Sequence, residues 1–199
     1  MGFLAKDQYT HQVTRLLKHG TKPLVTSENR AVDIIKSRGG TLSVDPNLRK
    51  ELRLDARIEH QFAELVARAD LLLPSGDELE CAAGVDGEAA ALQRLFDLGV
   101  GEIVLKRGAD GATCFNRDGS HVDAAAFVVT EVDPAGAGDC FGGAYVACRR
   151  LGMGQEAALT YACAAGGRNV TARGPMEGAG TRAELDAFII ATPRRRDAG

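Results

Sequence analysis

Short apolar runs alternate along the chain with longer segments of helical spacing. Four of these runs are bounded by turn residues and predict strands: 41–44, 71–73, 102–106 and 112–116. Segments with apolar positions three and four apart, or with capping residues at their starts, predict helices: 8–18, 31–37, 57–68, 87–98, 137–151 and 155–170. Helices that alternate with short apolar strands predict an α/β fold with a doubly wound, mostly parallel sheet.

Three further local patterns complete the expected layout. The strand at 112–116 is expected to pair with the stretch after Asp118 and Gly119, which favour a turn. The β-branched run 126–132 predicts another strand, and Thr181 is expected to cap a last helix.

Composition and charge narrow the class of protein. The chain has 199 residues, of which 45% are hydrophobic and 26% charged, so it can bury one sizeable core. Its formal charge of -3 argues against a nucleic-acid partner. No run reaches the roughly 18 apolar residues of a membrane helix, so we expect a cytoplasmic protein without membrane contact. Five widely spaced cysteines predict buried free thiols, and the four histidines have no ligand spacing.

The segment 132–143 is the most informative for chemistry. A β-rich run leads into small residues that open directly into a helix, which leaves the backbone N–H groups of Gly136, Ala137 and Gly138 available to an anion such as phosphate. Asp139 follows at once and is placed to take a proton from a substrate hydroxyl as general base. The alternative is that Asp139 only caps the helix.

The glycine spacing in this segment also overlaps a dinucleotide-binding fingerprint. That interpretation requires a following strand with an acidic residue about 20 positions on. The acid near that distance, Glu156, opens a helix instead. A dehydrogenase is therefore not favoured.

Four further segments accompany Asp133-Pro134-Ala135-Gly136-Ala137-Gly138-Asp139-Cys140-Phe141, namely 43–49, 72–79, 104–111 and 170–174. Together the five segments resemble the ribokinase-like (pfkB) carbohydrate kinases, and in particular the 2-keto-3-deoxygluconate and ketose kinases. The segment at 133–141 is similar to the second signature of that family, and all five follow the family's order. The resemblance covers residues 31–190 and implies a ribokinase-like fold.

The resemblance implies a role for each matching residue. Asp139 would be the catalytic base beside an anion hole of Gly136, Ala137 and Gly138. ATP would be held by Lys106, Gly108, Asp110, Gly111 and Cys163, and the sugar by Asn47, Arg49 and Asp139. Glu78 would organise Mg²⁺. A K⁺ site would be formed by Asp133, Ala135, Asn169, Ala172, Gly174 and Gly178. The alternatives are that Glu78 is a surface residue and that Arg49 belongs to a solvated charged cluster.

The sequence also departs from the family pattern. Pro134 and Ser75 replace the usual Thr and Asn, and the family's N-terminal third, with its lid and most sugar-binding residues, has no counterpart here. We expect a helical segment of unclear role at 1–30, a catalytic domain at 31–190 and a charged tail at 191–199. Without the family's N-terminal strands, one edge of the sheet would be exposed. Exposed edges pair with other chains, so we expect a homo-oligomer.

Two functions remain open from the sequence. The first is an ATP-dependent carbohydrate kinase that transfers the γ-phosphate to a hydroxyl of a sugar or sugar acid, with a substrate like 2-keto-3-deoxygluconate favoured. The second is a non-catalytic nucleotide-binding or assembly module derived from such a kinase.

Overall fold

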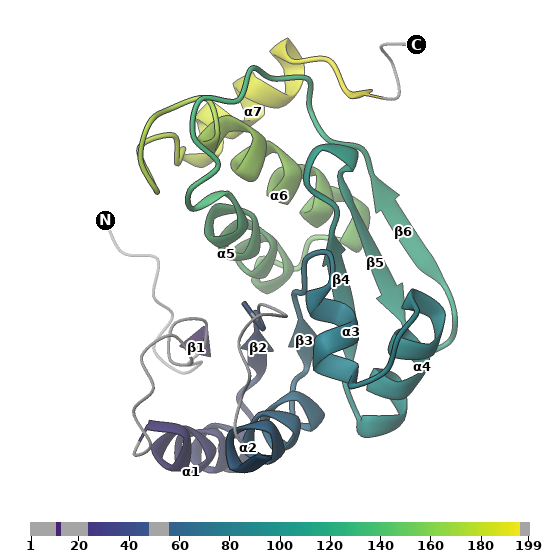
Figure 1. The fold of residues 1–199 in the computed structure, drawn as a ribbon. Coiled ribbons are helices and arrows are strands. Elements are labelled where there is room, and N and C mark those ends of the chain that lie inside the picture. Colours follow the sequence, from purple (N-terminus) through teal and green to yellow (C-terminus); the bar gives the residue numbers. More distant parts are fainter. Residues whose placement is uncertain (1–10, 13–23, 48–55, 196–199) are drawn as a thin grey trace. The chain divides into compact units, whose positions relative to one another are not determined.

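The computed structural model describes residues 11–12, 24–47 and 56–195. Figure 1 shows strands flanked by helices, with the chain coloured from purple at its start to yellow at its end. The chain forms two compact units, Met1–Ile103 and Val104–Gly199, which are described separately below. The domain boundaries expected at residues 30 and 190 stay predictions.

The first unit is built from parallel strands and their helices. Strands β1 (His11–Gln12), β2 (Leu42–Val44), β3 (Leu71–Leu72) and the start of β4 (Glu102–Lys106) are parallel neighbours in chain order. The described residues of this unit form the helices α1 (Leu24–Ser37), α2 (Ala56–Ala67), α3 (Glu78–Ala83) and α4 (Glu88–Leu98). Leu42, Leu72 and Ile103 are completely buried, as expected for strands covered by helices.

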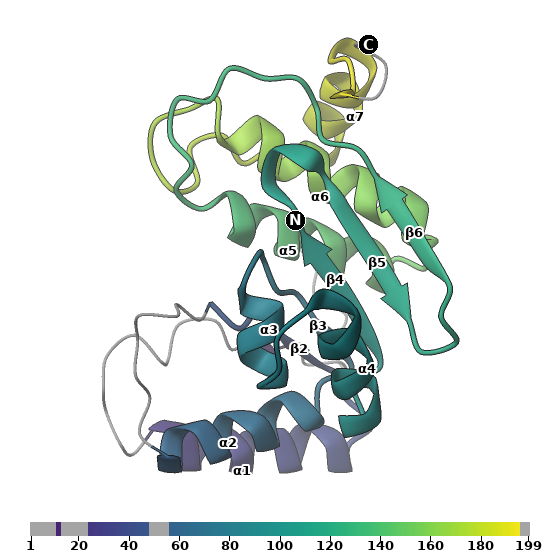
Figure 2. The same cartoon turned by 45° about the vertical axis from the view of Figure 1, so that its right-hand side comes forward.

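The second unit joins the end of β4 to a hairpin and three helices. After the single-turn helix η2 (Gly108–Asp110), β5 (Ala112–Asn116) follows β4 in the sheet and pairs antiparallel with β6 (His121–Ala124), as Figure 2 shows. Helices α5 (Ala137–Arg150) and α6 (Gln155–Asn169) pack against each other, and α7 (Arg182–Ala191) packs on α6. The Tyr145 side chain is fully buried, and its hydroxyl lies 3.4 Å from Cys114 Sγ.

Most of the predicted elements are confirmed. The predicted bounds of β4 and β5 agree with the structure to the residue, and Thr181 and Glu184 form a reciprocal capping box at α7. The mixed, mostly parallel sheet with its helices is the predicted α/β fold. All five cysteines are free, and all but Cys81 are buried.

Three predictions of secondary structure are wrong. Of the helix expected at 8–18 only His11 and Gln12 are described, and they form β1. Helix α1 begins at Leu24, seven residues before the predicted start. In the run 126–132 only Phe127 makes a bridge, to Arg194, because this segment lies beside the C-terminal residues instead of joining the sheet.

The bounds of the short helix α3 were not predicted, because six residues are too few for a helical period to emerge. Within the described ranges, no helix is long and apolar enough to cross a membrane. The homo-oligomer expected from the sheet edge stays a prediction.

Candidate active site

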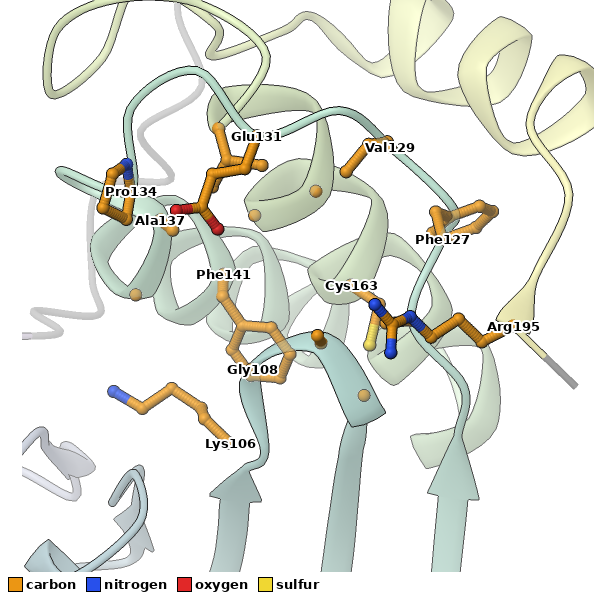
Figure 3. Close-up of a pocket in the computed structure, with 17 residues that line it drawn as sticks. Lys106, Gly108, Phe127, Val129, Glu131, Pro134, Ala137, Phe141, Cys163 and Arg195 are labelled. Atoms are coloured by element: carbon orange, nitrogen blue, oxygen red, sulfur yellow. The ribbon is translucent and has the colours of Figure 1, made fainter.

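A pocket of about 320 Å³ lies within the second unit, at the N-terminal end of α5. This volume is in the usual range of small-molecule sites. Its walls come from the end of β4, the η2 turn, the segment 126–134, helices α5 and α6, and Arg195 (Figure 3). The sequence-predicted residues among its lining are Lys106, Gly108, Gly111, Ala137, Gly138 and Cys163.

Backbone amides face one end of the site, where α5 begins. Gly136 is the N-cap, with φ at 75°, and a Cβ there would lie 1.7 Å from the carbonyl oxygen of Pro175, so this position requires glycine. The N–H of Ala137 donates to Pro134, whereas no acceptor within the described part of the chain takes up the N–H of Gly138 or Asp139. The start of α5 therefore offers unpaired donors and the positive end of the helix dipole to an anion.

Lys106 adds a full positive charge at this end. Its side chain leaves β4 and is only 9% exposed, and its Nζ would lie 3.5 Å from a Cβ placed on Gly138. Figure 3 shows Lys106 reaching from the end of the strand toward this side of the pocket. An ammonium group beside a helix N-terminus is a combination that favours phosphate groups.

Asp139 lies in the first turn of α5, exposed and outside the pocket lining. The N-cap is Gly136, with no side-chain cap hydrogen bond, so Asp139 is not the capping residue of α5. Its role as catalytic base stays a prediction. The carboxylate is left accessible, one residue beyond the unpaired amide of Gly138. A substrate hydroxyl brought to this turn can give its proton to that carboxylate.

Apart from Arg195, the opposite end of the pocket is apolar. Phe127, Val129 and Gly167 line it together with Cys163. Burial raises the pKa of the Cys163 thiol to about 12, so this sulfur is protonated at neutral pH and serves as a small apolar contact. Its Sγ lies 3.9 Å from the carbonyl oxygen of Ala124. A flat, weakly polar group fits this end better than a charged one.

The turn between β4 and β5 forms a third wall. Arg107 N donates to the carbonyl of Gly111 at 2.8 Å, which closes the turn. Gly111 has φ at 100°, and a Cβ there would lie 2.0 Å from the carbonyl oxygen of Ala124, so the turn needs glycine to pack on β6. Asp110 lies outside the pocket lining, although its carboxylate is 3.9 Å from a guanidinium nitrogen of Arg195.

The residues predicted to hold K⁺ are brought together beside α5. Asp133 accepts hydrogen bonds from Ala135 N at 3.0 Å and Gly174 N at 2.9 Å, and these two bonds, with Arg173 nearby, hold the pKa of its carboxyl below the usual value. Asn169 is completely buried and donates to the carbonyls of Ala135, at 2.9 Å, and Pro175, at 3.3 Å.

Two other predicted residues lie at Asn169. The backbone N–H of Ala172 donates to the Asn169 carbonyl at 3.2 Å, and Gly178 packs on the Asn169 backbone. The amide oxygen of Asn169 is buried without a hydrogen-bond partner in the described chain. A buried unpaired oxygen is unfavourable unless a cation or a water binds it, so these residues fit a monovalent cation.

The remaining predicted residues belong to the first unit. Asn47 follows β2, is partly exposed and has φ at 44°, while Arg49 lies outside the described residues. Glu78 starts α3, and its Oε2 accepts from Ser75 N at 2.7 Å and Ser75 Oγ at 2.6 Å. Glu78 thus braces a local turn. In the described part of the chain no group of three or more acidic, cysteine or histidine side chains could hold a metal by itself.

Several lining residues were missed by sequence reasoning. Phe127 and Val129 belong to the run expected as a strand, and Phe141 lies on the inner face of α5. Gly166 and Gly167 carried a usable signal, since paired glycines are unusual inside a helix, and the first of them lets α6 approach the start of α5. No sequence signal indicated Arg195, because its position depends on how the chain returns after α7.

Comparison with known proteins defines the class. Residues 6–182 match the pfkB family carbohydrate kinases, and the chain belongs to this family. A fructokinase from Vibrio alginolyticus is 29% identical over 196 residues, which are 95% of this chain and 63% of the fructokinase. A 2-dehydro-3-deoxygluconokinase from Thermoproteus tenax is 32% identical over 173 residues, 86% of this chain and 53% of the relative. The chain thus spans between half and two thirds of these relatives.

Solved structures share the same fold. A protein assigned as ribokinase II from E. coli, in complex with ATP and Mg²⁺, superposes with a TM-score of 0.85 at 34% identity, covering 92% of this chain and 58% of that protein. A fructokinase double mutant from Vibrio cholerae, with fructose, ADP and a potassium ion bound, has a TM-score of 0.80 at 26% identity. That match covers 94% of this chain and 62% of the fructokinase. The predicted ribokinase-like fold is confirmed.

Proposed function

We propose that this chain is the nucleotide-binding and phosphotransfer part of an ATP-dependent carbohydrate kinase. The observation that carries the proposal is the pocket at α5, where Lys106 and unpaired backbone amides lie at one end and an apolar cleft at the other. ATP has the matching polarity, with charged phosphates at one end and a flat base at the other. Family membership favours this function over the non-catalytic assembly module.

Asp139 is the catalytic base in this proposal. A sugar hydroxyl placed at the first turn of α5 gives its proton to the Asp139 carboxylate as its oxygen bonds to the γ-phosphorus and the bond to the ADP oxygen breaks. The amides of Gly136, Ala137 and Gly138, with Lys106, stabilise the charge on the transferring group. Gly108, Asp110 and Gly111 flank the sugar and phosphates of the nucleotide, and Cys163 faces the base.

The chain's residues fit the two cations differently. Asp133, the unpaired oxygen of Asn169 and nearby carbonyls would hold K⁺, which keeps the loop beside the anion hole in one conformation. Mg²⁺, when bound, neutralises the phosphates, and it is typically held through waters and the phosphates themselves. Glu78 is the candidate that orders those waters; one of its oxygens is bonded to Ser75.

The acceptor is a small sugar or sugar acid. The curated relatives are named for fructose and 2-dehydro-3-deoxygluconate, and we favour the latter, 2-keto-3-deoxygluconate, because residues 74–76 have the form of sugar-acid kinases. Asn47, at the end of β2, and Arg49 are the candidate sugar contacts, since ligands bind at the carboxyl ends of strands in such sheets.

The test measures nucleotide binding and phosphotransfer separately. Calorimetric titration of the chain with a non-hydrolysable ATP analogue and Mg²⁺ should show saturable binding that K⁺ strengthens. Phosphotransfer from ATP to 2-keto-3-deoxygluconate, fructose and ribose is then measured for the wild type and for Asp139→Asn. Removing the base should lower the rate about 10²- to 10⁴-fold and leave binding of the analogue unchanged.

Glu156→Gln is the matched control. Glu156 is also an exposed acid in the first turn of a helix, α6, and lies outside the pocket lining. This variant should keep the wild-type rate. Equal activity of Asp139→Asn and the wild type would contradict the role of Asp139, and a folded wild-type chain that binds no nucleotide would overturn the proposed function.

A further inference from the structure

The segment that follows α7 is held along one wall of the pocket. Val128 N donates to the carbonyl of Pro193, and Arg195 N donates to the carbonyl of Ala126, each at 2.9 Å. Between these bonds Phe127 and Arg194 form an antiparallel bridge. Residues 193–195 are therefore fixed by their backbone beside residues that line the apolar end of the site.

The two consecutive arginines in this segment have different surroundings. The Arg194 guanidinium packs 5.2 Å from the centre of the Phe127 ring and donates to Thr160 Oγ1 at 3.1 Å. Arg195 lines the pocket, and Figure 3 shows its guanidinium directed into it from the C-terminal segment. The Asp110 carboxylate is 3.9 Å away, and both side chains are more than half exposed, at 56% and 83%. Such an ion pair is too weak to hold the guanidinium.

We propose that Arg195 contacts the base of the bound nucleotide, with its planar guanidinium packed against the face of the ring. The inference rests on the proposed nucleotide binding and extends it to a residue outside the five family-like segments. The apolar neighbours Phe127, Val129 and Cys163 leave little hydrogen-bonding capacity at this end. A guanidinium is planar and weakly hydrated, and it stacks on π-systems better than an ammonium does. Positive charge for the phosphates is already supplied at the opposite end by Lys106 and α5.

The test compares two substitutions in the full chain. Arg195→Met keeps the apolar stem and removes the guanidinium, and Arg195→Lys keeps the charge and removes the plane. Dissociation constants for the non-hydrolysable ATP analogue with Mg²⁺ are measured by calorimetry, with thermal unfolding to verify that each variant is folded. We expect Arg195→Met to weaken binding about three- to tenfold, the size of a cation–π contact, and Arg195→Lys to restore at most a small part of this loss.

Arg117→Met is the matched control, because Arg117 is an exposed arginine of the β5–β6 turn outside the pocket lining, and it should bind as the wild type does. Unchanged affinity of Arg195→Met, in a wild type that binds, would overturn this inference alone. Full restoration by Arg195→Lys would also overturn it, since a charge contact would then suffice. A folded wild type that binds no analogue would overturn the proposed function, and this inference with it.

Discussion

The loops beside the N-terminal end of α5 and the turn before α3 are held by similar hydrogen bonds, which span very different distances along the chain. Asp133 accepts from Gly174 N, 41 residues away, and Asn169 donates to the carbonyl of Ala135, 34 residues away. Glu78, by contrast, accepts from the N–H and the hydroxyl of Ser75, three residues before it. A local bond shapes one turn, whereas a long-range bond fixes two loops against each other and must overcome more chain entropy. In this part of the molecule, the long-range bonds fix the loops beside the N-terminal end of α5.

The largest expected effect is at the close approach of these two loops. Gly136→Ala would place a methyl group 1.7 Å from the Pro175 carbonyl in a left-handed conformation, and we expect a loss of about 3 kcal/mol or more of unfolding free energy. Gly143→Ala is the control, because a Cβ there meets no atom within 4 Å in the middle of α5, and alanine should stabilise the helix by about 0.5–1 kcal/mol. Urea denaturation measures both. Similar unfolding free energies for the two variants would contradict the steric clash expected between a methyl group at position 136 and the Pro175 carbonyl.

Comparing one long-range bond with one local bond tests the contrast directly. Asn169→Ala removes the donor to two carbonyls in a fully buried position and should cost about 2–4 kcal/mol. Ser75→Ala removes one hydroxyl from a partly exposed turn and should cost about 0.5–1 kcal/mol. Both free energies come from urea denaturation under one buffer condition. If the Ser75 variant lost as much unfolding free energy as the Asn169 variant, the long-range bond would contribute no more to stability than the local one.

The local and long-range parts of the molecule were also predictable from sequence to different degrees. The bounds of β4 and β5 and the capping box at Thr181 follow from residues within a few positions of one another, so the local pattern was sufficient. The loop at 134–138, whose role as an anion hole stays a prediction, could be recognised for the same reason, since its residues are contiguous. The segment 126–132 was assigned wrongly because its partner, Arg194, lies more than sixty residues away, and nothing in the local pattern indicates that pairing.

The residues of the candidate site also differ in how well the sequence could predict them. Lys106, Gly108, Gly111, Gly138 and Cys163 line the pocket, and the roles that the resemblance implied for them stay predictions. All but Cys163 lie in segments marked by glycines in the sequence. Arg195 was missed because the charged tail resembles any solvated chain end. The unpaired oxygen of Asn169 could not be predicted either, because whether a buried amide is satisfied depends on every element packed around it.

The smallest expected effect concerns the local cap of α7 and its dependence on pH. The backbone N–H and the hydroxyl of Thr181, followed by the charge of Arg168, hold the pKa of Glu184 below its usual value. Because the folded state favours the ionised form, this carboxylate stabilises the protein fully above its unfolded pKa of about 4.3, and the contribution is lost as the pH falls through the lower folded pKa. Glu184→Gln should therefore lower the unfolding free energy at neutral pH and have a vanishing effect in acid.

Asn169→Ala is the control, because this side chain has no ionisable group. Its loss of unfolding free energy should be the same at both pH values. Urea denaturation of the wild type and both variants at pH values on either side of this range measures the difference, and a Glu184→Gln penalty independent of pH would show that the capping carboxylate contributes no stabilising charge.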